Sequence, residues 1–179
     1  MSIKGIISIV ITFFVVLFLI IGSAIFIERV PEGQVAVVYS PSGGAKEVLS
    51  PGWHLISLFE KTTKYPTRIT IIKDKVTVTT KDGKSVEMPV SFEYKVSSDK
   101  VLNIYKELGS QDVQQIQEGY MYQKLFRASR ALISKYSVLE IYGSEATEAS
   151  AEISAKMTED VEELGFIVTN VTLGTPKLD

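Results

Sequence analysis

The chain has 179 residues, with 19 basic and 21 acidic side chains and a formal net charge of -2. This even balance provides no basic surface for nucleic acid, so no nucleic-acid partner is expected. With no cysteine and a single histidine, His54, the chain has no disulfide framework, no thiolate nucleophile and no cluster of cysteine or imidazole ligands for zinc. No cofactor or metal is therefore expected.

The first element is an apolar segment from Gly5 to Ile27 that contains no charged residue. At about 1.5 Å per residue, a helix of this segment is roughly 34 Å long, slightly more than the ~30 Å hydrocarbon core of a bilayer. We therefore predict an uncleaved, single-pass transmembrane anchor over residues 1–27. Gly5, Val16 and Ile27 are expected to be embedded in the lipid bilayer of a cell membrane or an equivalent inner membrane.

Three other interpretations fit this segment less well. A secretory signal has an apolar core of about 7–15 residues, whereas here the apolar run continues past the candidate cleavage site at Gly22-Ser23-Ala24. A buried soluble helix would be shorter or amphipathic, and a hairpin within one leaflet would need a break, but no proline interrupts the run. The basic residues Lys4, Arg29 and Lys46 flank the segment almost evenly, so the side of the membrane that holds the soluble part stays open.

Residues 28–97 show the two-residue alternation of β-strands. The clearest local signal is Asp82-Gly83, because this dipeptide tolerates the positive φ of a two-residue hairpin turn. After it, apolar residues alternate without a break from Val86 to Val96, which predicts a long half-buried strand. Pro89 lies on the polar face of that strand and favours an edge strand or a bulge.

The segment from Trp53 to Phe59 is apolar on both alternating faces, with Leu55, Ile56 and Leu58 between its ends. Two interpretations fit this pattern. The segment is either a strand buried on both sides, or a loop that dips into one leaflet with Trp53 at the level of the lipid headgroups. The second interpretation makes these five residues a candidate membrane-surface contact.

From Asp99 onward the apolar period is that of helices, so residues 98–175 are expected to form a helix-containing part that ends in a strand. Ser110 and Ser144 are the expected N-caps of its second and third helices. Ser137 and Glu140 fit a capping box that opens a short turn. Strands first and helices later are typical of the α+β class. The predicted elements are helices over 101–108, 110–132 and 144–164, and a strand over 167–173.

No combination of side chains in the sequence suits catalysis. His54 lies in the apolar segment and is expected to pack or to lie on the surface, and Glu162-Glu163 belong to a polar, solvated helix face. Arg127 and Arg130 share a helix, where they either form a solvated face or meet an acidic partner. We therefore expect that the protein is not an enzyme.

After the apolar anchor, five segments follow in a recognisable order: VPEGQVAVVYSPSGG, SPGWHL, VTTKDGKSVEMPVSFEYKV, LFRASRALISKYSVLEIYGSEATEASAEI and ELGFIVTNVTL. Together they resemble the prohibitin and stomatin superfamily, also called the band 7 or SPFH domain, from about Val30 to Leu173. The resemblance implies a sheet-rich subdomain over residues 28–97 and a helix-containing subdomain over residues 98–175.

The same resemblance implies a non-enzymatic membrane scaffold. Members assemble with copies of themselves or a paralogue into membrane-bound rings or cages. They organise membrane microdomains and hold or regulate membrane proteins, in bacteria often an ATP-dependent membrane protease. Two alternatives remain: an accessory regulatory subunit of a membrane protease complex, and a monomeric membrane-anchored binding module.

The sequence departs from the family pattern at its end. Members usually continue into a long charged coiled-coil helix, whereas residues 176–179 follow a strand and contain no heptads. They are expected to be either the end of a naturally short chain or the start of a C-terminal helix in a longer protein, and the abrupt end after a strand favours the longer protein.

Overall fold

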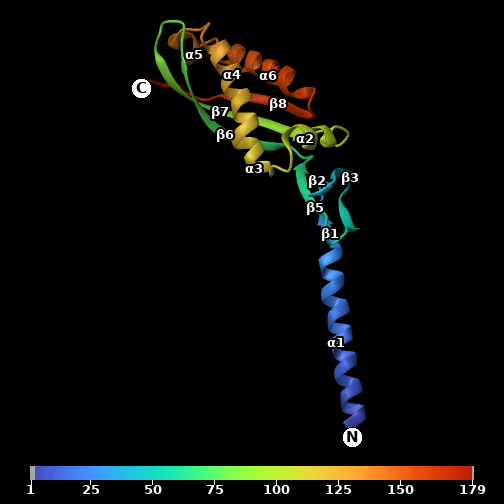
Figure 1. Ribbon diagram of the computed structural model, residues 1–179. Coiled ribbons are helices and arrows are strands. Elements are labelled where there is room, and N and C mark those ends of the chain that lie inside the picture. Colours follow the sequence, from blue (N-terminus) through green and yellow to red (C-terminus); the bar gives the residue numbers. More distant parts are fainter. Residues whose placement is uncertain (1–2, 179) are drawn as a thin grey trace.

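The computed structural model describes residues 3–178 and confirms the predicted α+β class, with a long N-terminal helix followed by sheets and shorter helices. Figure 1 shows helix α1 extending away from the rest of the protein, with strand β1 at its end. The helices are α1 (Ile3–Phe26), α2 (Val101–Leu108), α3 (Val113–Ile116), α4 (Tyr122–Ile133), α5 (Val138–Tyr142) and α6 (Ala146–Glu162). The strands are β1 (Ile27–Val30), β2 (Gln34–Ser40), β3 (Gly44–Leu49), β4 (Gly52–Leu55), β5 (Lys61–Pro66), β6 (Thr70–Thr79), β7 (Ser85–Val96), β8 (Phe166–Leu173) and β9 (Lys177–Leu178).

Two small sheets lie beside the end of α1. Strand β1 pairs with β4, and β2 lies between β3 and β5, with every neighbouring pair antiparallel. The centre of β2 is buried on both faces because its alternate side chains enter different clusters. Val35 and Val37 belong to the large core, whereas Ala36 and Val38 join a small cluster with Val30 and Leu49.

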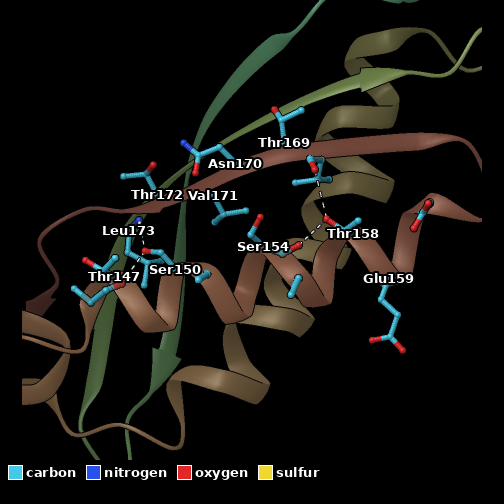
Figure 2. A pocket seen from close by; sticks show the side chains of 15 residues that line it. Thr147, Ser150, Ser154, Thr158, Glu159, Thr169, Asn170, Val171, Thr172 and Leu173 are labelled. Atoms are coloured by element: carbon cyan, nitrogen blue, oxygen red, sulfur yellow. Dashed lines mark hydrogen bonds between the residues drawn. The ribbon is translucent and has the colours of Figure 1, made fainter.

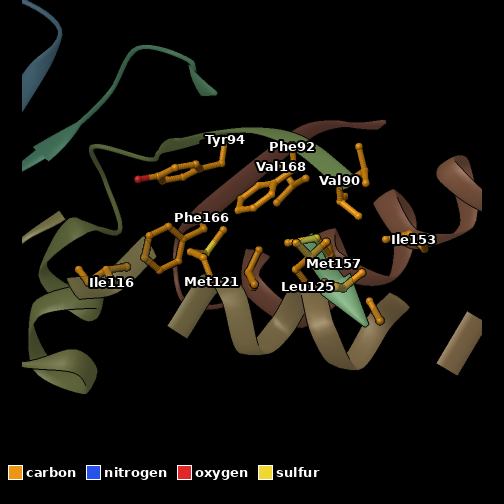
Figure 3. Packing of buried hydrophobic residues seen from close by; sticks show 14 of the residues in the cluster. Val90, Phe92, Tyr94, Ile116, Met121, Leu125, Ile153, Met157, Phe166 and Val168 are labelled. Atoms are coloured by element: carbon orange, nitrogen blue, oxygen red, sulfur yellow. The ribbon is translucent and has the colours of Figure 1, made fainter. Parts of the chain in front are cut away.

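Strands β6, β7 and β8 form a larger sheet, and β9 pairs with one end of β7. The predicted turn at Asp82-Gly83 joins β6 to β7, and the alternate residues from Val86 to Val96 are all buried, which confirms the long half-buried strand. Helices α4 and α6 cover that face of the sheet. Figure 3 shows Leu125 of α4 and Met157 of α6 in the layer below Phe92 of β7.

Pro89 lies in the central strand of the order β6-β7-β8, so the expectation of an edge strand is wrong. The bulge of this strand lies between Glu93 and Tyr94 and not at Pro89. Its carbonyl oxygen accepts a hydrogen bond from the Gly174 N–H at 2.7 Å. The N–H and C=O of one residue point to the same side of an antiparallel strand, so the N–H that proline lacks would have pointed toward Gly174. On that side β8 begins to pair at Val90, and β9 pairs only at Val86 and Glu87. Proline is tolerated because the ladder is already interrupted there.

The helix predicted from Ser110 to residue 132 consists of α3, a π-helical turn over Gln117–Met121, and α4. Its N-cap is Asp112 instead of Ser110. The Asp112 carboxylate accepts a hydrogen bond from the Gln115 N–H at 2.8 Å, and the Gln115 side chain accepts one from the Asp112 N–H, which completes a capping box. A carboxylate oxygen of Asp112 therefore caps the helix where a serine hydroxyl was predicted.

The capping box of Ser137 and Glu140 is confirmed at the start of α5. Ser144 is not the N-cap of α6. That position belongs to Glu145, which has helical backbone angles and makes no side-chain capping bond. The Ser144 hydroxyl instead donates a hydrogen bond to the Glu145 carboxylate.

The C-terminal end of the described chain forms strand β9 at Lys177–Leu178, where a helix start was one expectation for residues 176–179. Asp179 lies outside the described residues, as do residues 1 and 2 of the predicted anchor. Strand β7 ends at Val96, and the proposed division of the soluble part at residues 97 and 98 stays a prediction.

Gly165 joins α6 to β8 at a close approach of two backbone segments. Its φ is +118°, and a Cβ added there would lie 2.6 Å from the Lys100 Cβ and 3.3 Å from the Lys100 carbonyl oxygen. The Gly165 carbonyl also accepts a hydrogen bond from the Ser97 N–H at 2.9 Å. A side chain at this position meets both backbone strain and a fixed neighbour.

We expect Gly165→Ala to lower the free energy of unfolding by about 1–3 kcal/mol, because alanine does not readily adopt this φ. Thermal unfolding of the detergent-solubilised protein, followed by circular dichroism, measures the loss. Gly43→Ala is the matched control, since the nearest atom to its added Cβ is the Ser40 Cβ at 3.8 Å. Equal melting temperatures for the two variants would contradict this account.

Candidate membrane-contact site

Helix α1 is a candidate membrane span by length and composition. Its 24 residues extend about 36 Å at 1.5 Å per residue. From Gly5 to Gly22 the mean hydropathy is 3.0, and no residue of this window is buried against the protein. The Thr12 hydroxyl donates to the Ser8 carbonyl at 2.9 Å, so this polar group is satisfied within the helix. Val16 lies near the middle of the helix with 48% of its surface exposed.

The helix ends one residue earlier than predicted. Ile27 is the first residue of β1, where it pairs with Leu55 of β4, and its side chain is 42% exposed. Backbone pairing with β4 replaces the next helical hydrogen bonds, so the chain passes from helix to strand between Phe26 and Ile27. Of the residues expected in the membrane, Gly5 and Val16 lie in α1, and Ile27 lies at its junction with the sheet.

Strand β4 places two exposed apolar side chains beside this junction. Trp53 is 70% exposed and Leu55 is 81% exposed. Leu55 pairs with Ile27, the residue directly after α1, and Trp53 pairs with Arg29, two residues further along β1. Both side chains therefore lie close to the end of α1. The Arg29 guanidinium lies 5.3 Å from the centre of the Trp53 ring, which is within the range of a cation–π interaction.

A tight turn after β4 exposes two more apolar residues. The Glu60 N–H donates to the Ser57 carbonyl at 2.9 Å, and Leu58 and Phe59 occupy the two central positions, 51% and 79% exposed. The Glu60 carboxylate accepts from Lys46 and, at 2.8 Å, from the Ser57 N–H. The hydrogen bond from Lys46, followed by that from the Ser57 N–H, lowers the pKa of Glu60. These two bonds fix the Glu60 carboxylate across the turn.

These exposures show that a strand buried on both sides is the wrong interpretation of Trp53 to Phe59. The strand ends at Leu55, and the turn follows. The sequence signal for this turn was the Ser57 and Glu60 pair three residues apart, which the continuous apolar run obscured. Ile56 differs from the other candidate contact residues, since it is half-buried and packs against the small cluster beneath β2.

The remaining polar candidates lie apart from one another. The His54 Nε2 bonds to the Ser50 carbonyl at 2.7 Å on the β1–β4 side. Glu162 and Glu163 are exposed at the end of α6, and Arg127 and Arg130 are exposed on α4. Within residues 3–178, no group of three or more acidic or histidine side chains is placed to hold a metal ion.

Lysine substitutions at two neighbouring positions distinguish exposed from packed apolar residues in this segment. We expect Leu55→Lys to change the free energy of unfolding by less than about 0.5 kcal/mol, and Ile56→Lys to lower it by about 1–3 kcal/mol. Denaturant unfolding of the protein in detergent measures both changes. A larger loss for Leu55→Lys than for Ile56→Lys would contradict the assigned positions.

Comparison with known proteins identifies the family of this chain. No curated protein matches the chain. A family model described as SPFH domain / Band 7 family matches residues 28–179, so it begins at the second residue of β1 and continues to the end of the sequence. This match confirms the resemblance drawn from the sequence: the chain belongs to the SPFH domain / Band 7 family.

Proposed function

We propose that this protein is a membrane-anchored scaffold that assembles with copies of itself, or with a paralogue, into rings or cages. In that role it organises the surrounding membrane and holds or regulates membrane proteins, with a membrane-bound ATP-dependent protease as one candidate partner. The observation that carries the proposal is the order of its parts: an exposed apolar helix leads without a linker into an SPFH domain. The family is generally of scaffold type and not enzymatic.

The proposal places α1 across the bilayer as a single span. Its length suits the hydrocarbon core, and a helix satisfies its own backbone groups in lipid. A span ending near Phe26 puts the β1–β4 pair at the lipid headgroups, where the Trp53 ring and the Arg29 guanidinium are both favoured. Leu55, Leu58 and Phe59 then contact the outer part of one leaflet. This contact also removes the exposed apolar patch from water.

Tryptophan fluorescence tests the membrane contact directly, because Trp53 is the only tryptophan in the chain. We expect its emission to be quenched by lipids brominated near the headgroup when the full-length protein is reconstituted in liposomes. Replacing Leu55 and Phe59 by serine should reduce that quenching, because the apolar contacts that hold the segment at the membrane are lost.

Serine substitutions at Ile69 and Ile71 provide the matched control for this experiment. These isoleucines are 55% and 58% exposed but lie on the β5–β6 connection and on β6, outside the proposed contact. The control should keep the quenching of the unmodified protein. Emission typical of water-exposed tryptophan, with no quenching by brominated lipid, would show that this segment stays off the membrane.

The assembly is tested by the mass of the full-length protein in native lipid. We expect chemical cross-linking and mass photometry to show particles of many copies, because the shared anchor confines the copies to two dimensions and raises their effective concentration. If only particles of one or two copies are found, the scaffold proposal fails, and a monomeric membrane-anchored binding module becomes the better interpretation. Co-purification of an ATP-dependent protease with the large particles would identify it as a partner.

A further inference from the structure

The two outer strands of the larger sheet are open along their outer edges. In the order β6-β7-β8, each of β6 and β8 has a strand neighbour on one side only, among the described residues. Proteins usually block long free edges with charge, proline or cover. Strand β8, with the sequence FIVTNVTL, has no charged residue and no proline. The last four residues of β6, from Val76 to Thr79, have none either.

A groove runs along the free edge of β8, between that strand and α6. Its helix side is formed by small residues, including Ala151, Ser154 and Ala155, which leave room beside the strand. Two hydrogen bonds join α6 to this strand. The Leu173 N–H donates to the Ser150 hydroxyl at 3.3 Å, as Figure 2 shows. The Thr158 hydroxyl donates to the Val168 carbonyl at 3.4 Å.

The end of this groove is acidic. Glu159 and Glu162 line it and are exposed, while the side of α6 that faces the core is apolar. Over its whole length α6 has five acidic residues and one lysine, Lys156. Lys156 lies 2.9 Å from Glu159 and 3.1 Å from Asp160, and Glu162 makes no ion pair within the described chain.

A second groove lies at the opposite edge of the sheet, between β6 and α4, and it is basic. It is lined by Thr77 to Thr80 and by Phe126, Arg127, Arg130, Ala131 and Ser134. Helix α4 has Lys124, Arg127 and Arg130 and no acidic residue. Both arginines are exposed, and neither forms an ion pair with any residue from 3 to 178.

The charges of the two grooves are opposite in sign and have the same spacing along their helices. Arg127 and Arg130 are three residues apart on one helix, and so are Glu159 and Glu162 on the other. Side chains at this spacing are neighbours on one helix face. Two such pairs can therefore meet as two parallel ion pairs when the outer face of α4 approaches the outer face of α6 of another molecule.

We propose that the α4–β6 edge of one copy docks against the α6–β8 edge of the next copy, with Arg127 and Arg130 facing Glu159 and Glu162. Because the two surfaces lie on opposite edges of one sheet, the contact is heterologous. It repeats from copy to copy and closes into a ring when the rotation permits. A two-fold dimer cannot use both surfaces in one interface. The proposal rests on the proposed scaffold function and names the surface that would build it.

Charge reversal in the full-length protein tests this surface. We expect Arg127→Glu with Arg130→Glu, and separately Glu159→Lys with Glu162→Lys, to raise the concentration of half-assembly at least about tenfold, because each places like charges opposite one another. Mass photometry of the detergent-solubilised full-length protein over a dilution series measures this. All four substitutions in one chain should restore assembly, since the charges are then exchanged and not removed. Assembly of the unmodified protein should also weaken at about 1 M salt.

The matched control is Glu107→Lys with Glu163→Lys, which reverses two exposed glutamates on a different face, one of them adjacent to Glu162. It should assemble as the unmodified protein does. Every variant should melt within about 3 °C of the unmodified protein, because all these side chains are exposed. A loss of assembly accompanied by a lower melting temperature would overturn the proposal for that pair of residues.

The outcomes separate this surface from the scaffold function. If the unmodified protein forms large particles and both reversals leave their size unchanged, the docking surface is wrong and the scaffold stands. If the reversals abolish assembly but the fourfold variant does not restore it, these charges do not face each other between copies, and another partner occupies the grooves. If the unmodified protein is monomeric, both proposals fail.

Discussion

The alternating burial of β7 is the constraint on which the larger sheet depends. Its six apolar side chains, from Val86 to Val96, form one continuous face. That face can be removed from water only if β6 and β8 extend it sideways and α4 and α6 cover it. The core that results is formed by β7 together with segments far apart in the chain, such as Ile116 before α4 and Phe166 in β8. A charged side chain on this face would therefore destabilise the packing of β7 against the neighbouring strands and against α4 and α6.

Once one face of the sheet is buried, its outward face and its two edges still need water or hydrogen-bond partners. The outward side chains of β7, such as Ser91, Glu93 and Lys95, are polar and suited to water. The edges differ from them, because their backbone groups need hydrogen-bond partners whatever the side chains are. Helix hydroxyls satisfy some of these groups: Tyr122 donates to the Lys75 carbonyl of β6 at 3.4 Å, as Thr158 does for β8. Both helices thus act as partial covers for the strand edges.

The sequence predicted the features that depend on local chemistry. The strand after Asp82-Gly83 and the capping box of Ser137 and Glu140 follow from residues within a few positions of each other. The predictions for Ser110 and Ser144 were wrong, because several neighbouring polar side chains compete to cap one helix end. Pro89 was assigned to an edge because a single sequence does not show that the strand beside it stops at that residue.

The candidate site was only partly predictable for the same reason. The apolar run from Trp53 to Phe59 was evident, but its exposure depends on β1 and on Lys46, which are distant in sequence and fix the strand and the turn. The opposing charges of α4 and α6 were visible as separate patterns. Their position at opposite edges of one sheet depends on the strand order β6-β7-β8, in which residues 166–173 join residues 85–96 across an intervening set of helices.

The direct junction between α1 and β1 has a mechanical consequence. The last residue of α1, Phe26, is followed directly by the first residue of β1, Ile27. The residues from Ile27 to Val30 are paired with β4. A helix that is longer than the local hydrocarbon thickness tilts to keep its apolar surface in lipid. If α1 spans a bilayer as proposed, such a tilt also turns the first strand of the small sheet, because no residue separates the helix from β1. In the proposed scaffold, the inclination of the β1–β4 pair would therefore follow the thickness of the bilayer that α1 crosses.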